Sequence, residues 1–149
     1  MWLLLSWWLL AAVLPSDALA ILESARHVTV YSLSPGATPR EKLDQKKTFH
    51  GYRILRRLDV KGETKSELLG KLYTAIAEQP DPARCFIPRH GIRATSSGET
   101  VDLVICFECK QFKSYLNGKE GGGTVGVSAE KHFNNLIRTT SPSDKTRAP

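Results

Sequence analysis

Several motifs and residue types are scarce or missing in this sequence of 149 residues. It contains no H-E-x-x-H metalloprotease motif, no G-x-S-x-G nucleophile elbow and no paired-carboxylate pattern, so no common hydrolase class is indicated. No apolar run reaches the roughly 20 residues that a transmembrane helix needs. Tryptophan is confined to Trp2, Trp7 and Trp8. The sequence therefore favours a non-enzymatic binding or structural module.

The first 20 residues have the pattern of a secretion signal. An apolar run covers residues 2–14, broken only by Ser6, and the A-L-A of residues 18–20 fits an A-x-A cleavage site. We expect residues 1–20 to be a signal peptide removed after Ala20, and the protein to be periplasmic or extracellular. No Lys or Arg precedes the apolar run, which departs from the usual signal pattern. An uncleaved leader that anchors the protein to a membrane is the alternative; the mature protein is expected to have no membrane span.

The chain beyond the leader is basic and long enough for one domain. Removal of residues 1–20 leaves 129 residues, too few for two cores. The leader holds one carboxylate, Asp17, and no Lys or Arg, so its removal raises the formal net charge from +6 to +7. A basic surface favours an anionic surface or polymer as partner. Nucleic acid is the least expected of these partners because the protein is expected to be exported.

Two strands are predicted before the first helix. Val28 and Val30 alternate with polar residues within 26–33, which indicates a half-buried strand. Residues 34–48 carry two prolines and a glycine without apolar periodicity, which predicts a mobile loop. A second strand is predicted over 49–60, where Arg56 is out of pattern and the apolar residues of one parity are Tyr52, Ile54, Leu58 and Val60.

Two helices follow from the 3.6-residue period. Residues 64–79 show one apolar stripe, with Thr64 and Glu67 spaced as a capping box and Pro80 ending the helix. Residues 128–138 predict a second helix with Ser128 as its N-cap. Its apolar face is expected to contain Ala129, Phe133, Leu136 and Ile137. The domain is thus expected to cover residues 21–138, followed by a disordered tail over 139–149.

A β-hairpin is predicted between the two helices, with Ser97 and Gly98 as its two-residue loop. This register pairs chemically matched residues, which stabilises a sheet. The expected pairs are Thr95 with Thr100, Ala94 with Val101, Arg93 with Asp102, Ile92 with Leu103, and His90 with Ile105.

The second hairpin strand is expected to continue through the cysteines. Its apolar residues occupy odd positions up to Phe107 and even positions from Phe112, so we predict a β-bulge between Phe107 and Lys110. The bulge would also bring Cys106 and Cys109 onto one face. The glycine-rich residues 117–127 lack a phosphate-loop ending and are expected to form a flexible turn before a short strand.

All three cysteines lie within 25 residues of one another: Cys85, Cys106 and Cys109. In an oxidising compartment this arrangement favours one disulfide and a third, buried thiol, with Cys85 as one partner and the other partner left open. The alternative is a zinc site formed by Cys85, His90, Cys106 and Cys109. A redox C-x-x-C is less consistent with the sequence, because residues 110–116 have the pattern of a strand instead of a helix. A hydrolytic pair of Cys85 and His90 lacks an identifiable orienting group or oxyanion hole.

Four blocks of this sequence carry a resemblance: "VTVYSL", "FHGY", "CFIPRHG" and "VDLVICFEC". They resemble an uncharacterised family of small exported bacterial proteins that share C-F-x-P-R-H-G and I-C-F-E-C blocks. The resemblance spans roughly Val28 to Tyr115. It implies no catalytic assignment, and Lys110 departs from the apolar residue usual at that position in the family.

The sequence therefore predicts an exported α+β domain in the order ββαβββα, with a mainly antiparallel sheet packed on two helices. Its expected role is that of a non-enzymatic module without a cofactor. The alternative is a zinc-binding or thiol-dependent protein that uses the cluster of Cys85, His90, Cys106 and Cys109.

Overall fold

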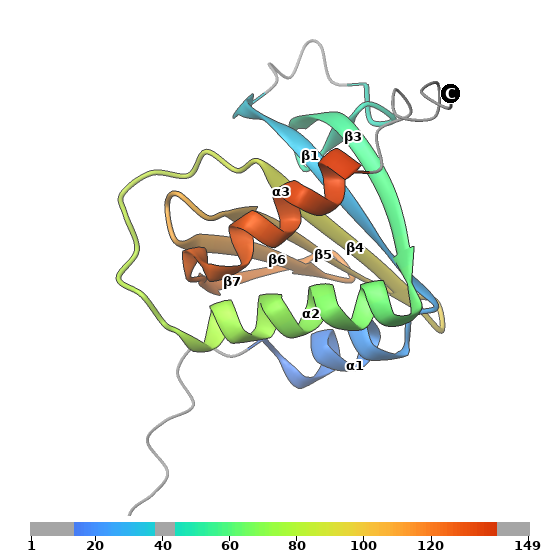
Figure 1. Ribbon diagram of the computed structural model, residues 1–149. Coiled ribbons are helices and arrows are strands. Elements are labelled where there is room, and N and C mark those ends of the chain that lie inside the picture. The colour runs from blue at the N-terminus through green and yellow to red at the C-terminus, as the bar shows by residue number, and fades with distance from the viewer. Residues whose placement is uncertain (1–13, 38–43, 140–149) are drawn as a thin grey trace, which may run out of the picture.

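The computed structural model describes residues 14–37 and 44–139 (Figure 1). A curled, seven-stranded antiparallel sheet, a half-barrel, packs with three α-helices, which confirms the predicted α+β class. In chain order the elements are α1 (Ser16–Ser24), β1 (His27–Ala37), β2 (Thr48–Phe49), β3 (Tyr52–Lys61), α2 (Gly62–Ala77), β4 (His90–Ser96), β5 (Glu99–Cys106), β6 (Gln111–Leu116), β7 (Lys119–Thr124), the 3₁₀ turn η2 (Val127–Ala129) and α3 (Glu130–Thr139). The sheet order is β2-β3-β1-β4-β5-β6-β7. The predicted order did not include α1, and it treated β2 with β3, and β5 with β6, as single strands.

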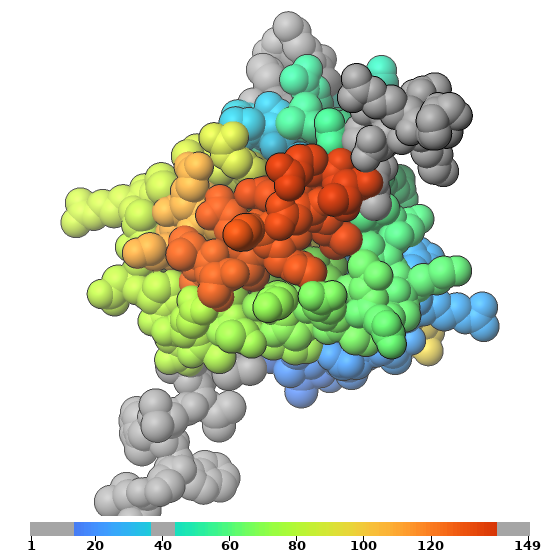
Figure 2. Space-filling view, in the orientation of Figure 1, coloured from blue at the N-terminus to red at the C-terminus, as the bar shows by residue number. Residues whose placement is uncertain are grey.

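The helices cover one face of the sheet, which we call the helix face. Figure 2 shows α2 and α3 side by side over this side of the molecule. Because successive strand residues point to opposite faces, the alternating apolar residues of β1, β4 and β5 bury their side chains here. They include Val28, Val30, Ile92, Ala94, Val101, Leu103 and Ile105. The other face, which we call the open face, holds the second apolar cluster described below.

The helix α2 confirms the predicted stripe, with Leu68, Leu69 and Leu72 buried, but its start differs from the prediction. Lys61 ends β3 and Gly62, at φ +59°, begins the helix without a connecting loop. No side chain caps this N-terminus, so the predicted capping box of Thr64 and Glu67 is wrong. The Glu67 carboxylate instead lies 3.9 Å from Nδ1 of His132 on α3.

The helix α3 buries the expected apolar face, including Phe133 and Ile137. The prediction that Ser128 caps it is wrong, because Ser128 lies within η2, one turn before the helix. Its hydroxyl donates to the carboxylate of Glu78, just beyond α2. Ser128 therefore connects two helices instead of capping one.

The β4–β5 hairpin has the predicted register at every expected pair, from Thr95 with Thr100 to His90 with Ile105. Ser97 (φ +51°) and Gly98 (φ +77°) form its two-residue loop. Positive φ at both residues is the type I′ geometry that matches the twist of the flanking strands.

The predicted bulge after β5 is wrong. The chain turns back over residues 107–110, and β6 pairs with β5 from Cys106 opposite Gln111 to Val101 opposite Leu116. This turn accounts for the change of parity, because Phe112 on β6 lies opposite Ile105 on the same face. Lys110 adopts φ +58° in the turn and is exposed, so it does not occupy a core position.

Residues 119–124, predicted as part of a flexible turn, form the strand β7. The turn itself is Asn117-Gly118, both at positive φ. A Cβ at Gly122 would lie 2.6 Å from the Phe112 carbonyl oxygen. Glycine thus allows β7 to approach β6 closely.

The predicted loop over 34–48 is shorter in the structure, because β1 extends to Ala37 and β2 begins at Thr48. Residues 38–43 of this loop and residues 140–149 of the predicted tail lie outside the described residues. In β3 the register shifts between Arg56, opposite Ser32, and Ile54, opposite Leu33. The intervening Leu55 forms a bulge that moves Ile54 to the opposite face from Leu58. Arg56 stays on the face of Leu58, where its guanidinium donates to the Ile137 carbonyl of α3 at 3.5 Å.

Candidate functional site

The cysteines form one disulfide and one free thiol, as the sequence predicted. Cys85 is bonded to Cys109, with their Cα atoms 5.6 Å apart. Cys106 is free and buried. Its sulfur accepts a hydrogen bond of 3.2 Å from the backbone N–H of Cys109, so the third cysteine packs as part of the β5–β6 turn.

The disulfide fastens the segment between α2 and β4 to the β5–β6 turn. Ala83 N–H donates to the carbonyl of Cys109 at 3.0 Å. The Gln111 side-chain amide donates to the carbonyls of Ala83 and Cys85. This arrangement fits a structural role for the Cys85–Cys109 bond.

His90 does not join the sulfur atoms. It lies on the helix face, where its ring contacts Phe107 and Phe133 at centroid distances of 5.4 and 5.6 Å. Nε2 donates to the side-chain oxygen of Asn134 on α3 at 2.8 Å, and burial lowers the pKa of the ring. Cys106 is one residue from Ile105, which pairs with His90, so its side chain points to the opposite face.

The zinc alternative is therefore not supported. Two of its four proposed ligands, Cys85 and Cys109, are bonded to each other, and the other two, His90 and Cys106, lie on opposite faces of the sheet. Within residues 14–37 and 44–139, no group of three or more His, Cys, Asp or Glu side chains is placed to hold a metal ion. None of the helices in these residues has the length and apolar character required to span a membrane.

A second apolar cluster lies on the open face. Its buried members are Tyr31, Leu33, Phe49 and Val104, with Tyr52, Ile54, Phe86 and Tyr115 packed around them. The turn between β2 and β3 folds over the sheet, so that the Phe49 ring stacks on Tyr31 at a centroid distance of 4.4 Å. A Cβ at Gly91 on β4 would lie 2.6 Å from the Phe49 ring. The absence of a side chain at Gly91 therefore leaves room for the Phe49 ring.

Asp102 on β5 is the polar centre of the open face. Asp102 is 5% exposed, and its carboxylate accepts two hydrogen bonds from Arg93, Nε to Oδ1 at 2.8 Å and Nη2 to Oδ2 at 2.7 Å. His50 Nε2 lies 2.7 Å from Oδ2. A carboxylate only accepts, so Nε2 of His50 carries the hydrogen.

The electrostatic environment keeps Asp102 ionised. Burial alone would raise its pKa, but the hydrogen bonds and positive charge of Arg93, with those of His50, outweigh burial and hold the pKa below its usual value. The His50 ring also stacks on Tyr115, with centroids 3.8 Å apart and planes 9° apart. Arg93 and His50 are thus held in fixed orientations.

Three basic side chains of this face each lie over an aromatic ring. The pairs, with their distances to the ring centroid, are Arg57 over Tyr31 at 5.7 Å, Arg93 over Phe49 at 5.3 Å and Lys113 over Phe86 at 4.8 Å. They come from β3, β4 and β6, so they extend across the sheet. A pocket of about 520 Å³ opens beside the middle pair and is lined by Gln45, Thr48, Phe49, His50, Gly51 and Arg93.

The sequence indicated only part of this site. The pairing of Arg93 with Asp102 followed from the hairpin register. His50 was not selected as a site residue. The available signal was its place before Gly51 in a turn between aromatic residues; both residues have positive φ in the structure.

With this geometry established, comparison with protein-family models, curated proteins and solved structures finds no significant match to the chain. The function is therefore inferred from the site itself.

Proposed function

We propose that the protein is an exported, non-enzymatic binding module that holds an anionic polymer against the open face of its sheet. The observation that carries this proposal is the row of three cation–aromatic pairs across β3, β4 and β6. Export is supported by the Cys85–Cys109 disulfide, because such bonds persist mainly in oxidising compartments. The proposed kinship with the uncharacterised exported bacterial family is consistent with this role.

The chemistry of the open face suits an acidic polysaccharide. Arg57 and Lys113 are exposed, and the Arg93 side chain is 46% exposed, so all three cations are accessible to a ligand. Arg93 is already oriented by Asp102, so binding costs little additional side-chain entropy there. An extended polymer would contact the three cations together and use the pocket beside Arg93 for one sugar unit. Nucleic acid remains the less favoured polyanion because the protein is proposed to be exported.

The His50–Asp102 pair differs from a Ser-His-Asp triad, in which Nδ1 of the histidine bonds the carboxylate and Nε2 faces the nucleophile, because here Nε2 lies 2.7 Å from the carboxylate. Among the described residues, the His50 ring forms a hydrogen bond to Asp102 and to no hydroxyl or thiol. The geometry therefore favours binding over catalysis.

Binding of polygalacturonate, measured by calorimetry at several salt concentrations, tests the proposal. The double variant Arg57→Gln/Lys113→Gln removes two open-face cations and leaves Arg93 in place. Its affinity should fall at least about tenfold, and the salt dependence should weaken by about two counterions, by analogy with other polyanions. Lys71→Gln/Lys131→Gln has the same net charge but changes exposed residues of α2 and α3, and should lose less than about twofold. Equal losses in the two double variants, or no binding by the wild type, would overturn the proposal.

A further inference from the structure

The helix α1 contains the bond at which the sequence predicts removal of the leader. Ala20 and Ile21 are consecutive residues in its middle. The side of α1 that faces the sheet is buried in the main core, with Ala18, Ile21 and Leu22 at 1%, 3% and 0% exposure. Leu14, just before the helix, is 4% exposed. Residues on both sides of the expected cleavage bond therefore contribute to one packed core.

Polar contacts attach the same helix to α2 and, through the hydroxyls of Ser24 and Ser96 at 2.8 Å, to β4. The buried ammonium of Lys65 on α2 donates to the carbonyls of Glu23 at 2.9 Å and Ala25 at 2.6 Å. These carbonyls lie at the C-terminus of α1, where helical acceptors lack partners and positive charge is favourable. Tyr73 donates its hydroxyl hydrogen to the Glu23 carboxylate at 2.8 Å. Lys65 and Tyr73 thus fasten the C-terminal end of α1 to α2.

We infer that residues from Leu14 onward belong to the mature folded protein, and that any removal of the leader occurs before Leu14 instead of after Ala20. This inference is independent of the proposed ligand. It replaces the cleavage position suggested by the A-x-A pattern and assigns residues 14–20 to the domain.

The hydrogen bonds of the α1 backbone oppose cleavage after Ala20. In an α-helix the N–H of each residue bonds to the carbonyl four residues earlier. Cleavage after Ala20 would remove the acceptors for the N–H groups of residues 21–24 and leave the bond from Ala25 N–H to the Ile21 carbonyl, 3.0 Å long. A four-residue remnant does not sustain a helix, so the contacts of Lys65 with its C-terminus would lose their geometry.

The charge of a new N-terminus at Ile21 also opposes cleavage after Ala20. Cleavage would convert the Ile21 amide into an ammonium group, and Ile21 is 3% exposed. A buried, unpaired charge is strongly unfavourable. The new N-terminus would have to leave the core and withdraw the Ile21 side chain with it.

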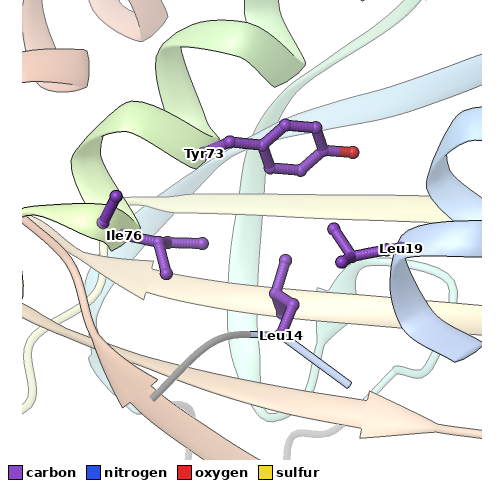
Figure 3. A pocket seen from close by; sticks show the side chains of 5 residues that line it. Leu14, Leu19, Tyr73 and Ile76 are labelled. Atoms are coloured by element: carbon purple, nitrogen blue, oxygen red, sulfur yellow. The ribbon is translucent and has the colours of Figure 1, made fainter. Parts of the chain in front are cut away.

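The apolar pocket between α1 and α2 is formed in part by residues that cleavage after Ala20 would remove. It has a volume of about 260 Å³ and is lined by Leu14, Leu19, Tyr73, Ile76 and Ala77. Figure 3 shows Leu14 and Leu19 facing Tyr73 and Ile76 across it. Cleavage after Ala20 would remove the two leucines and expose the apolar side of α2 to solvent. Retention of residues 14–20 keeps this surface covered.

The first test is the intact mass and N-terminal residue of the exported protein produced from the full chain. We expect a chain that begins at or before Leu14. The variant Ala20→Gln changes an exposed helix position and abolishes the A-x-A pattern, so under our inference the same N-terminus is found. A wild-type protein that begins at Ile21, with processing lost or moved in Ala20→Gln, would overturn the inference.

A second test does not depend on export. Elastase, which accepts small residues before the cleaved bond, is applied to the folded full-length chain, and the products are identified by mass. Proteases prefer exposed, irregular segments over packed helices, so we expect the Ala20–Ile21 bond to stay intact while the chain is folded and to be cut in denaturant. Cleavage at this bond with retention of the native circular dichroism spectrum would contradict the inference.

Discussion

Loss of the Cys85–Cys109 disulfide should destabilise the protein chiefly by freeing the unfolded chain. The two cysteines are 24 positions apart. The chain-entropy relation for a loop of that size corresponds to about 3.5 kcal/mol at 25 °C. Cys85 is exposed while Cys109 is fully buried, so Cys85→Ala removes the cross-link without opening a core cavity at the substituted residue. We expect the free energy of unfolding to fall by about 3 kcal/mol.

Urea unfolding followed by circular dichroism measures this loss, and the m-value should increase because the unfolded chain becomes less compact. Reduction provides the control: a reductant should destabilise the wild type by a similar amount and leave Cys85→Ala unchanged. Thiol titration of the wild type in denaturant should find one thiol before reduction and three afterwards. A variant within about 0.5 kcal/mol of the wild type under oxidising conditions would refute this reasoning, and three thiols throughout would refute the disulfide itself.

Two further substitutions test the polar contacts of the fold. Asp102→Asn should lower the free energy of unfolding by about 2 kcal/mol near pH 6, because Arg93 and His50 lose a charged acceptor. The pKa of Asp102 is lowered in the folded state. Its contribution to the free energy of unfolding is therefore present above the unfolded pKa of about 3.9 and is lost as pH falls through the folded pKa. In urea titrations, a stability difference between wild type and Asp102→Asn that does not narrow below about pH 4 would contradict this assignment. Lys65→Met should lower the free energy of unfolding by about 1–2 kcal/mol in the same assay, because two carbonyls at the end of α1 lose their donor. Lys71 is exposed on the same helix, so Lys71→Met should be near neutral. Equal effects of the two substitutions would argue against the contact of Lys65 with the α1 carbonyls.

Sequence patterns were most informative where the interacting residues are close along the chain. The β4–β5 register could be predicted because a two-residue turn determines every pair that follows it. The β5–β6 turn was missed because residues 107–110 contain no glycine, proline, asparagine or aspartate, the usual indicators of a turn. The caps at Thr64 and Ser128 were wrong because neighbouring elements changed the start of each helix: β3 runs directly into α2, and Ser128 bonds to Glu78.

The sequence by itself determined the strand alternation, the apolar faces of α2 and α3, and the participation of Cys85 in one disulfide. These features depend on local periodicity, turn chemistry and the number and spacing of the cysteines. Only the tertiary structure decided that Cys109 is the partner, that α1 completes the core, and that His50 meets Asp102, 52 residues away along the chain. Those contacts follow from the sheet order and from the folding of the β2–β3 turn over the open face. They join residues remote in the chain, where no local pattern specifies which side chains meet.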